Sequence, residues 1–177
     1  MRILKAVEGG VLWLYEDNAA AANHLRQEAE KYGVNPSRLV FAKNMPLAEH
    51  LARHRLADLF IDAFPCNAHT TASDALWAGL PVLTLMGNSF ATRVAASLLN
   101  AIGLPELVTK SQEEYEALAI EIAANPEKLV SLKQKLANNR LTTPLFDTPQ
   151  FTNNLEQTYA HMYERYQSDL PPAHIGQ

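Results

Sequence analysis

Segment 65–74 carries the polar residues best placed to do chemistry. It follows the apolar run 59–61 and leads into a helical pattern. Thr70 and Thr71 stand where that helix should begin, and Asp74 follows at spacings that place all three side chains on one face. The first backbone N–H groups of a helix lack intrahelical partners and lie at the positive end of its dipole, which favours an anion. Threonine hydroxyls add donors for phosphate oxygens, and the carboxylate can accept hydrogen bonds from ribose hydroxyls. The pattern predicts a site for a phosphate beside a sugar.

The same residues also allow a purely structural interpretation. His69 can adjoin the N-cap, Thr70 and Thr71 can be ordinary capping residues, and Asp74 can simply offset the helix dipole. Spacing alone does not separate this interpretation from a phosphate site. After Asp74 we expect Leu76, Trp77 and Ala78 to be core residues that pack the helix on its sheet. Gly79 is expected to end the helix.

Histidine, arginine and cysteine side chains near this segment suggest other chemistry. His50 and His54 are spaced as zinc ligands on a helix, but no third ligand is evident, so no metal site is predicted. Arg53 suits planar recognition of a base edge or a carboxylate, although a solvated helix charge is an equal alternative. Cys66 with His69 as its base would be a thiol nucleophile, but no third residue orients the histidine. The glycine-rich motifs of dinucleotide sites and P-loops do not occur.

Length and composition indicate a single globular domain. The 177 residues allow a real core, and an apolar fraction of 47% is typical of such proteins. A net charge of −4, with acids and bases interspersed, offers no basic face for nucleic acid or anionic lipid. No apolar run approaches the roughly 20 residues of a membrane span, and Gly9 and Gly10 interrupt any signal-peptide core. One cysteine cannot form an internal disulfide, so a cytoplasmic protein is expected.

Short apolar runs that alternate with helical patterns predict a doubly wound α/β layer of parallel strands. The first run, 11–15, is continuously apolar, as expected of a strand buried on both faces. In such a sheet ligands bind at the carboxyl ends of the strands, which brings the loops 43–47, 63–69 and 86–90 together. The expected strands are 11–15, 38–42, 58–62, 81–85 and 107–108, and the expected helices are 2–7, 18–32, 47–55, one that opens at Thr70, and 91–100.

From residue 111 onward the pattern is purely helical, with helices expected at 112–124, 126–140 and 148–166. Residues 168–177 include two adjacent prolines and are expected to be flexible. In the last helix, apolar residues recur at intervals of three and four and must bury against some surface: Phe151, Leu155, Tyr159, Met162 and Tyr163.

Several stretches together resemble the protein O-GlcNAc transferase and SPINDLY family. The most specific is the string CNxHTTxxDxLWAG, which begins at Cys66 and ends at Gly79. The similarity also includes segments 11–14, 56–58, 80–82, 91–97 and 144–148, so that it extends over nearly the whole chain.

This resemblance implies the carboxyl-terminal, donor-binding lobe of a GT-B glycosyltransferase. Residues 1–167 would form a Rossmann-like lobe, incomplete at its N-terminus, and 111–167 its helical tail. The family transfers GlcNAc or a related sugar from a nucleotide sugar such as UDP-GlcNAc to serine or threonine hydroxyls of proteins, without a metal or other cofactor. Its full-length members carry tetratricopeptide repeats ahead of the catalytic region.

The resemblance implies a role for each residue at the expected helix start. Thr70 and Thr71 match the pair that holds the donor diphosphate, and His69 matches the histidine beside the phosphates. Asp74 matches the carboxylate on the ribose. These roles agree with the physical interpretation of the same segment.

The resemblance also implies contacts to the base and the sugar. His50 and Arg53 match positions around the nucleobase, with the arginine on its edge, and Cys66 matches a cysteine near the N-acyl group of the sugar. Animal members have a lysine after the proline of the nucleotide loop, whereas this chain has Leu47 after Pro46. This departure leaves GDP-fucose open as a donor.

By the same resemblance, three parts of the catalytic region are missing from this sequence: the first strand of the lobe, a lysine that neutralises the diphosphate, and the amino-terminal lobe with the acceptor cleft and the base. No catalytic residue is therefore expected here, and the chain alone is expected to be inactive. An exposed sheet edge is expected near 11–15, where a partner chain can dock. Two alternatives stay open: a non-catalytic α/β interaction module, and a lobe of a nucleotide-sugar epimerase.

Overall fold

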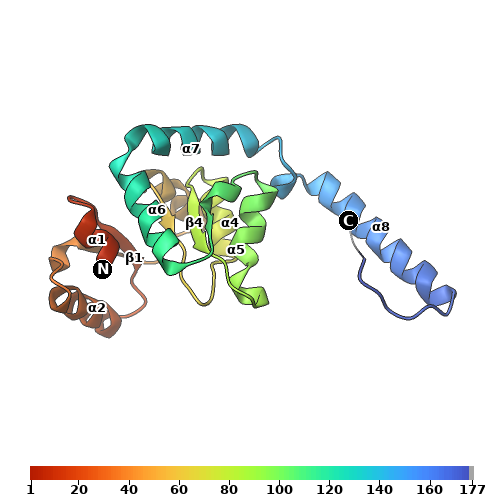
Figure 1. Ribbon diagram of the computed structural model, residues 1–177, viewed down its shortest axis with the longest axis horizontal. Helices are drawn as coiled ribbons and strands as arrows, with labels where there is room; N and C mark the ends of the chain where they lie inside the picture. Colours follow the sequence, from red (N-terminus) through yellow and green to blue (C-terminus); the bar gives the residue numbers. More distant parts are fainter. Residues whose placement is uncertain (176–177) are drawn as a thin grey trace.

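The computed structural model describes residues 1–175, in which short parallel strands form two small sheets surrounded by helices (Figure 1). β1 (Leu12–Tyr15) pairs with β2 (Leu39–Ala42). The second sheet has the order β3-β4-β5, formed by Phe60–Ile61, Val82–Leu85 and Val108–Thr109. The prediction of an α/β fold with parallel strands is confirmed.

The helices lie close to where the sequence pattern places them. Short 3₁₀ turns lie between them at Pro36–Arg38, His54–Leu56, Phe90–Thr92, Pro105–Leu107 and Pro144–Phe146. The α-helices are α1 (Arg2–Ala6), α2 (Ala19–Lys31), α3 (Leu47–Arg53), α4 (Thr70–Trp77), α5 (Val94–Ala101), α6 (Gln112–Ala124), α7 (Pro126–Asn139) and α8 (Thr148–Gln167).

Side-chain caps fix the starts of several helices. The side chain of Asn18 accepts a hydrogen bond from the backbone N–H of Ala21 at 2.8 Å and opens α2. Ser111, Asn125 and Asp147 make the equivalent contact at α6, α7 and α8. Each such cap contributes about 1 kcal/mol. The predicted stop of α4 is confirmed: Gly79 has φ +87°, a conformation that glycine adopts without strain.

The main hydrophobic core lies between the β3-β4-β5 sheet and the helices around it. Burying one such leucine, isoleucine or valine contributes about 1.5–3 kcal/mol. A second, smaller cluster lies beneath the β1-β2 sheet and consists of Leu4, Ala29, Val34 and Leu39. The main core includes Leu76, Val82, Leu99, Ile102, Leu104, Ile122 and Leu136.

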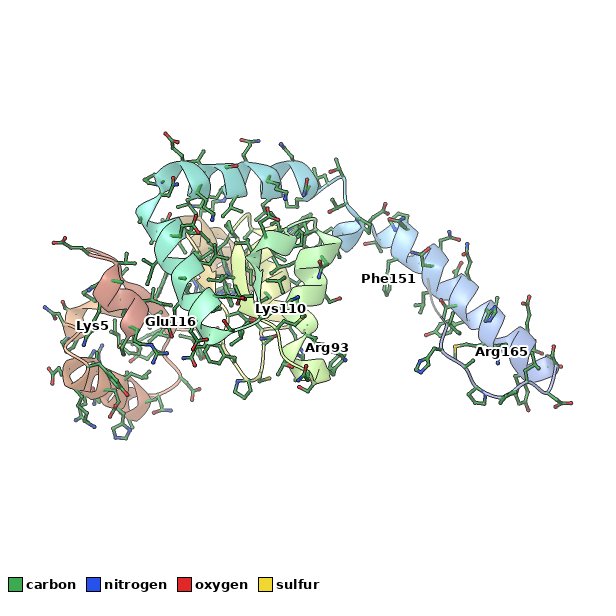
Figure 2. The ribbon with its side chains drawn as sticks, viewed as in Figure 1. Lys5, Arg93, Lys110, Glu116, Phe151 and Arg165 are labelled. Atoms are coloured by element: carbon green, nitrogen blue, oxygen red, sulfur yellow. The ribbon has the colours of Figure 1, made fainter. Side chains whose placement is uncertain are left out.

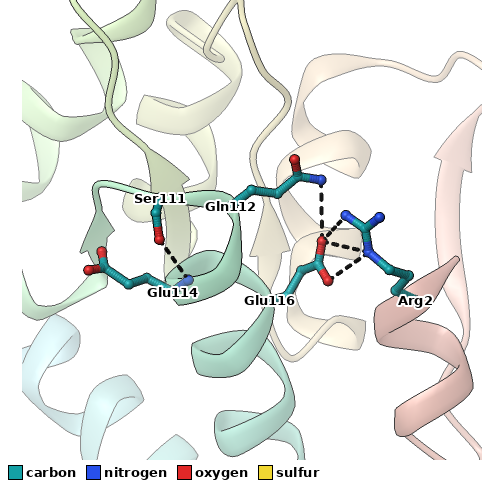
Figure 3. Close-up of polar contacts among 5 residues, drawn as sticks. All are labelled: Arg2, Ser111, Gln112, Glu114 and Glu116. Atoms are coloured by element: carbon teal, nitrogen blue, oxygen red, sulfur yellow. Dashed lines mark hydrogen bonds and ion pairs between the residues drawn. The ribbon is translucent and has the colours of Figure 1, made fainter.

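An ion pair links the N-terminal part of the chain to α6 (Figure 3). The Arg2 guanidinium on α1 donates from Nε to both carboxylate oxygens of Glu116, at 2.9 and 2.8 Å. Gln112 donates a further hydrogen bond to the same carboxylate at 3.3 Å. The Arg2 contacts lower the pKa of Glu116, so the pair is fully charged at neutral pH.

The expectation that strand 11–15 is buried on both faces is wrong. Val11 is 60% exposed and Tyr15 is 58% exposed. β1 pairs only with β2, and within residues 1–175 no strand lies along its other edge. The expected strand 58–62 is likewise reduced to Phe60–Ile61, whose described partner is β4 alone. In the part of the chain that the structure describes, β1 and β3 are therefore edge strands, each with one row of unpaired backbone groups.

Trp77 does not lie in the core as expected. It is 45% exposed at the end of α4, whereas Leu76 is buried. Its ring lies edge-on to Phe146 at 5.1 Å between centroids, beneath the Arg140 guanidinium. Leu107 was expected in the last strand, but it belongs to a 3₁₀ turn, and β5 begins one residue later.

The last helix, α8, projects away from the body of the molecule (Figure 1). Figure 2 shows Phe151 and Arg165 on this projecting segment. The predicted helix is confirmed, but its predicted burial is not, because Phe151, Tyr159, Met162 and Tyr163 are all exposed. Among residues 1–175, no helix has both the length and the apolar character needed to cross a membrane.

Candidate functional site

The start of α4 has open backbone donors. His69 occupies the N-cap position, and its side chain makes no capping hydrogen bond within the described chain. The first intrahelical bond runs from Ser73 N–H to His69 O at 3.1 Å, so the amides of residues 70–72 precede it. His69, Thr70 and Thr71 are exposed. The helix start thus presents unpaired N–H groups and two hydroxyls to solvent, which is the arrangement that binds an anion.

Asp62, immediately after β3, anchors the segment that leads to α4. Its carboxylate is 1% exposed and accepts hydrogen bonds from the backbone N–H of Ala68 at 2.7 Å and from the Thr84 hydroxyl at 2.6 Å. The Tyr115 hydroxyl donates to the carbonyl oxygen of Asp62 at 2.8 Å. Burial raises the pKa of Asp62, while the hydrogen bonds from Thr84 and Ala68 act in the opposite direction.

Asn67 joins the loop after β3 to the loop after β4. Its backbone N–H donates to the carbonyl oxygen of Ala91 at 2.9 Å. Its side-chain amide donates to the carbonyl oxygens of Ala63 and Leu85, at 3.2 and 3.4 Å. Two of the loops predicted to meet at the carboxyl edge therefore do meet. The sequence pattern did not single out Asn67, because its importance comes from partners that lie far along the chain.

Phe90 is a site residue that the sequence pattern missed. Its ring is 75% exposed and lies edge-on to His69, with 5.9 Å between ring centroids. The turn that carries it begins with a capping box between Ser89 and Thr92, a spacing that could have indicated an ordered turn. A large apolar ring held in the open beside the start of α4 forms one wall of the candidate site.

α3 carries His50, one of the residues expected around the nucleoside. Burial lowers the pKa of His50, the charges of Arg53 and His54 add to this effect, and the Asp74 carboxylate opposes it. His50 and Asp74 belong to different helices, α3 and α4, and the Asp74 charge acts on His50.

Arg53 is anchored rather than free in solvent. Its Nη1 donates to the carbonyl oxygen of Lys43 at 3.0 Å, and its guanidinium lies 5.8 Å from the centre of the Trp13 ring on β1. These contacts argue against the alternative of a purely solvated helix charge. They hold the guanidinium beside the third of the predicted loops, 43–47.

The remaining candidates for metal or thiol chemistry are His54 and Cys66. His54 is buried and donates from Nδ1 to the carbonyl oxygen of His50 at 2.8 Å. Within residues 1–175, no group of three or more His, Cys, Asp or Glu side chains is arranged to hold a metal ion. Cys66 is exposed, and its sulfur contacts the neighbouring Asn67 carbonyl rather than His69.

These features define an α/β lobe of parallel strands with an open helix start at the carboxyl edge, a common arrangement in nucleotide-binding domains. Comparison with known proteins identifies the family. The model of glycosyl transferase family 41 matches residues 1–155. The chain belongs to this family.

Two curated relatives match almost the whole chain. A UDP-N-acetylglucosamine–peptide N-acetylglucosaminyltransferase of Caenorhabditis elegans is 37% identical over 99% of this chain and 15% of its own length. The probable UDP-N-acetylglucosamine–peptide N-acetylglucosaminyltransferase SEC of Arabidopsis thaliana is 42% identical over 98% of this chain and 18% of its own length. The chain therefore spans less than a fifth of the length of these relatives.

A solved structure with the same fold is a mutant O-GlcNAc transferase of Thermobaculum terrenum. It superposes with a TM-score of 0.86 at 33% identity, over 92% of this chain and 32% of that one. The predicted Rossmann-like lobe of a glycosyltransferase is confirmed at the level of fold and family.

Proposed function

We propose that this chain is the donor-binding lobe of a metal-independent protein O-glycosyltransferase, which transfers GlcNAc or a related sugar from a nucleotide sugar to serine or threonine. The observation that carries the proposal is the open start of α4, where Thr70 and Thr71 are exposed beside uncapped N–H groups. Family membership supports the same reaction, since the relatives named above are N-acetylglucosaminyltransferases of peptides.

In this proposal the diphosphate of the donor lies against the N-terminus of α4. The N–H groups and the hydroxyls of Thr70 and Thr71 stabilise the negative charge that grows on the departing nucleoside diphosphate, with His69 beside it. Asp74 holds the ribose hydroxyls. Because these donors are fixed before the reaction, they need little reorganisation as the glycosidic bond breaks.

The remaining candidate residues contact the base and the sugar of the donor in this proposal. Arg53 recognises the edge of the base, and its bond to Lys43 together with its position over Trp13 supports a fixed orientation. His50 lies beside the nucleoside in this proposal. Cys66 lies near the N-acyl group of the sugar.

The complete reaction in this proposal needs parts that this chain does not supply. An amino-terminal lobe provides the acceptor cleft and the base, and tetratricopeptide repeats precede it in a cytoplasmic protein. A further strand, from the same protein or from a partner chain, covers the free edge of β1. We therefore expect no transfer to a peptide acceptor by the 177-residue chain alone, and turnover by that chain would contradict this part of the proposal.

A thermal-shift measurement tests the donor site. UDP, UDP-GlcNAc and GDP-fucose are each added to the purified chain, with ADP as a control nucleotide. A ligand present at one hundred times its dissociation constant stabilises the folded state by about 2.7 kcal/mol. We expect a shift with UDP and with UDP-GlcNAc that exceeds the shift with ADP. A larger shift with GDP-fucose would identify GDP-fucose as the preferred donor, bound at the same proposed site.

No shift with any of these ligands would favour an interaction module that keeps the fold and works by docking. The exposed apolar residues of α8 are the observation that favours this second candidate. A nucleotide-sugar epimerase, the other alternative, would bind UDP-GlcNAc but convert it without any protein acceptor.

A further inference from the structure

A buried carboxylate outside the proposed ligand contacts, that of Asp62, is hydrogen-bonded to the segment that leads into α4. Asp62 directly follows β3, and its backbone N–H donates to the carbonyl oxygen of Leu83 at 3.0 Å, so its main chain is fixed by β4. A buried carboxylate is costly unless its oxygens are hydrogen-bonded. Both oxygens of Asp62 are satisfied, one by Ala68 N–H and the other by the Thr84 hydroxyl.

The bond to Ala68 acts on the proposed phosphate site through the backbone. Ala68 immediately precedes His69, the N-cap of α4, and lies two residues before Thr70. The distance between Ala68 N and Asp62 Oδ1 is 2.7 Å, at the short end of the range for N–H···O hydrogen bonds. The other contacts of Asp62 come from Thr84 on β4 and Tyr115 on α6, which are both buried.

α4 differs from the helices that carry their own caps. At α2, α6, α7 and α8 a side chain at the N-cap occupies one of the free N–H groups. At α4, within the described residues, the N-cap side chain makes no such bond. The start of α4 is held one residue earlier, at Ala68, and its own N–H groups stay free for a ligand.

We infer that Asp62 is a positioning residue for the donor diphosphate, because it fixes the backbone that aims the first N–H groups of α4. This inference rests on the proposed function, in which the diphosphate binds at that helix start. Asp62 does not touch the ligand, and it acts through Ala68.

Two substitutions of Asp62 distinguish the effect of losing its hydrogen bond to Ala68 from the effect of changing the charge alone. Asp62→Ala leaves Ala68 N–H without its partner, and we expect the affinity for UDP to fall about tenfold or more. Asp62→Asn keeps one carbonyl oxygen for Ala68, so we expect its affinity to stay within about threefold of the wild type. Both affinities are measured by titration calorimetry on the 177-residue chain, well below the melting temperature of each variant.

Two buried threonines on neighbouring strands provide a matched pair. Thr84 donates to Asp62, whereas Thr109 donates to the carbonyl oxygen of Thr84 at 2.9 Å and makes no contact with the carboxylate. Thr84→Val and Thr109→Val each remove one buried hydroxyl with little change of shape. We expect both to lower the melting temperature, but only Thr84→Val to weaken UDP binding, by about fivefold.

The outcomes are distinguishable. If the wild-type chain does not bind UDP, the proposed function fails, and this inference fails with it. If the wild type binds UDP but affinity falls in step with melting temperature across all four variants, Asp62 only stabilises the fold and the inference is overturned. If Asp62→Ala does not fold, the threonine pair decides: equal affinities in Thr84→Val and Thr109→Val overturn the inference.

Discussion

The backbone N–H of Asn67 donates a hydrogen bond to the carbonyl oxygen of Ala91, and this single bond joins the segment before α4 to the turn after β4. The same pair of loops brings His69 and Phe90 into edge-on contact. The loops after β3 and β4 therefore meet at the candidate site through a hydrogen bond and a ring contact. Residues in either loop should affect ligand binding.

Removing the hydroxyl of Thr71 or the carboxylate of Asp74 should weaken UDP binding. Thr71→Ala and Asp74→Ala are each expected to cost roughly 1–3 kcal/mol of binding free energy, the range for losing a hydrogen-bond partner of a charged group or of a buried polar group. Titration calorimetry measures both. Thr152→Ala on the projecting helix α8 is the matched control and should leave the affinity unchanged. Unchanged affinity in both site variants would contradict the assignment.

Arg53 should contribute to recognition of the base but not of the phosphates. Arg53→Met keeps the apolar stem and removes the guanidinium, so UDP affinity should fall about tenfold while affinity for inorganic pyrophosphate stays the same. Competition between the two ligands gives both constants. Thr71→Ala serves as the comparison, because it should weaken both ligands. An equal loss for UDP and pyrophosphate in Arg53→Met would place this arginine at the phosphates.

Gly87 allows the turn that carries Phe90 to close. A Cβ at this position would lie 2.6 Å from Oγ1 and 2.8 Å from Cβ of Thr92, distances that force the turn to shift. Gly87→Ala should therefore lower the free energy of unfolding by about 1–3 kcal/mol. Urea denaturation measures the change. The exposed neighbour provides the control, since Asn88→Ala should stay within about 0.5 kcal/mol. Equal stabilities of the two variants would show that the turn relaxes freely.

Asp62 should make stability depend on pH in a direction opposite to that of a salt-bridged aspartate. Because burial raises its pKa in the folded state, the folded protein binds a proton more readily than the unfolded chain. Stability from this group therefore increases as the pH falls from above the raised pKa toward the ordinary aspartate value. The unfolding free energy of the wild type minus that of Asp62→Asn, which cannot titrate at this position, should therefore rise as the pH falls over that interval. Urea denaturation at a series of pH values tests this, and a signed difference that stays constant or falls would contradict it.

The sequence pattern predicted the elements and the chemistry of α4 well because both depend on local information. Helix periodicity, the stop at Gly79 and the position of Thr70 at the helix start are properties of short segments. The family resemblance was most specific in one string, which runs from Cys66 to Gly79, and short stretches along nearly the whole chain supported it.

The errors and omissions depend on contacts between distant segments. Trp77 looked like a core residue because its neighbours are apolar, yet its position at the end of α4 leaves it half exposed under Arg140. The role of Asn67 comes from Ala91 and Leu85. No local pattern reports that Phe90 lies beside His69, because the loops after two neighbouring strands meet only in the folded sheet.

The division of the strands into two sheets has a consequence for cooperativity. The β1-β2 sheet has its own small hydrophobic cluster, formed by Leu4, Ala29, Val34 and Leu39. The Arg2–Glu116 ion pair, which links α1 to α6, is accessible to solvent. Electrolyte weakens such a bridge, because mobile ions screen exposed charges. Amide protons of β1 and β2 should therefore exchange with deuterium sooner than those of β4, and this gap should widen as ionic strength rises. We therefore expect the N-terminal quarter of the chain to open locally before the β3-β4-β5 sheet does.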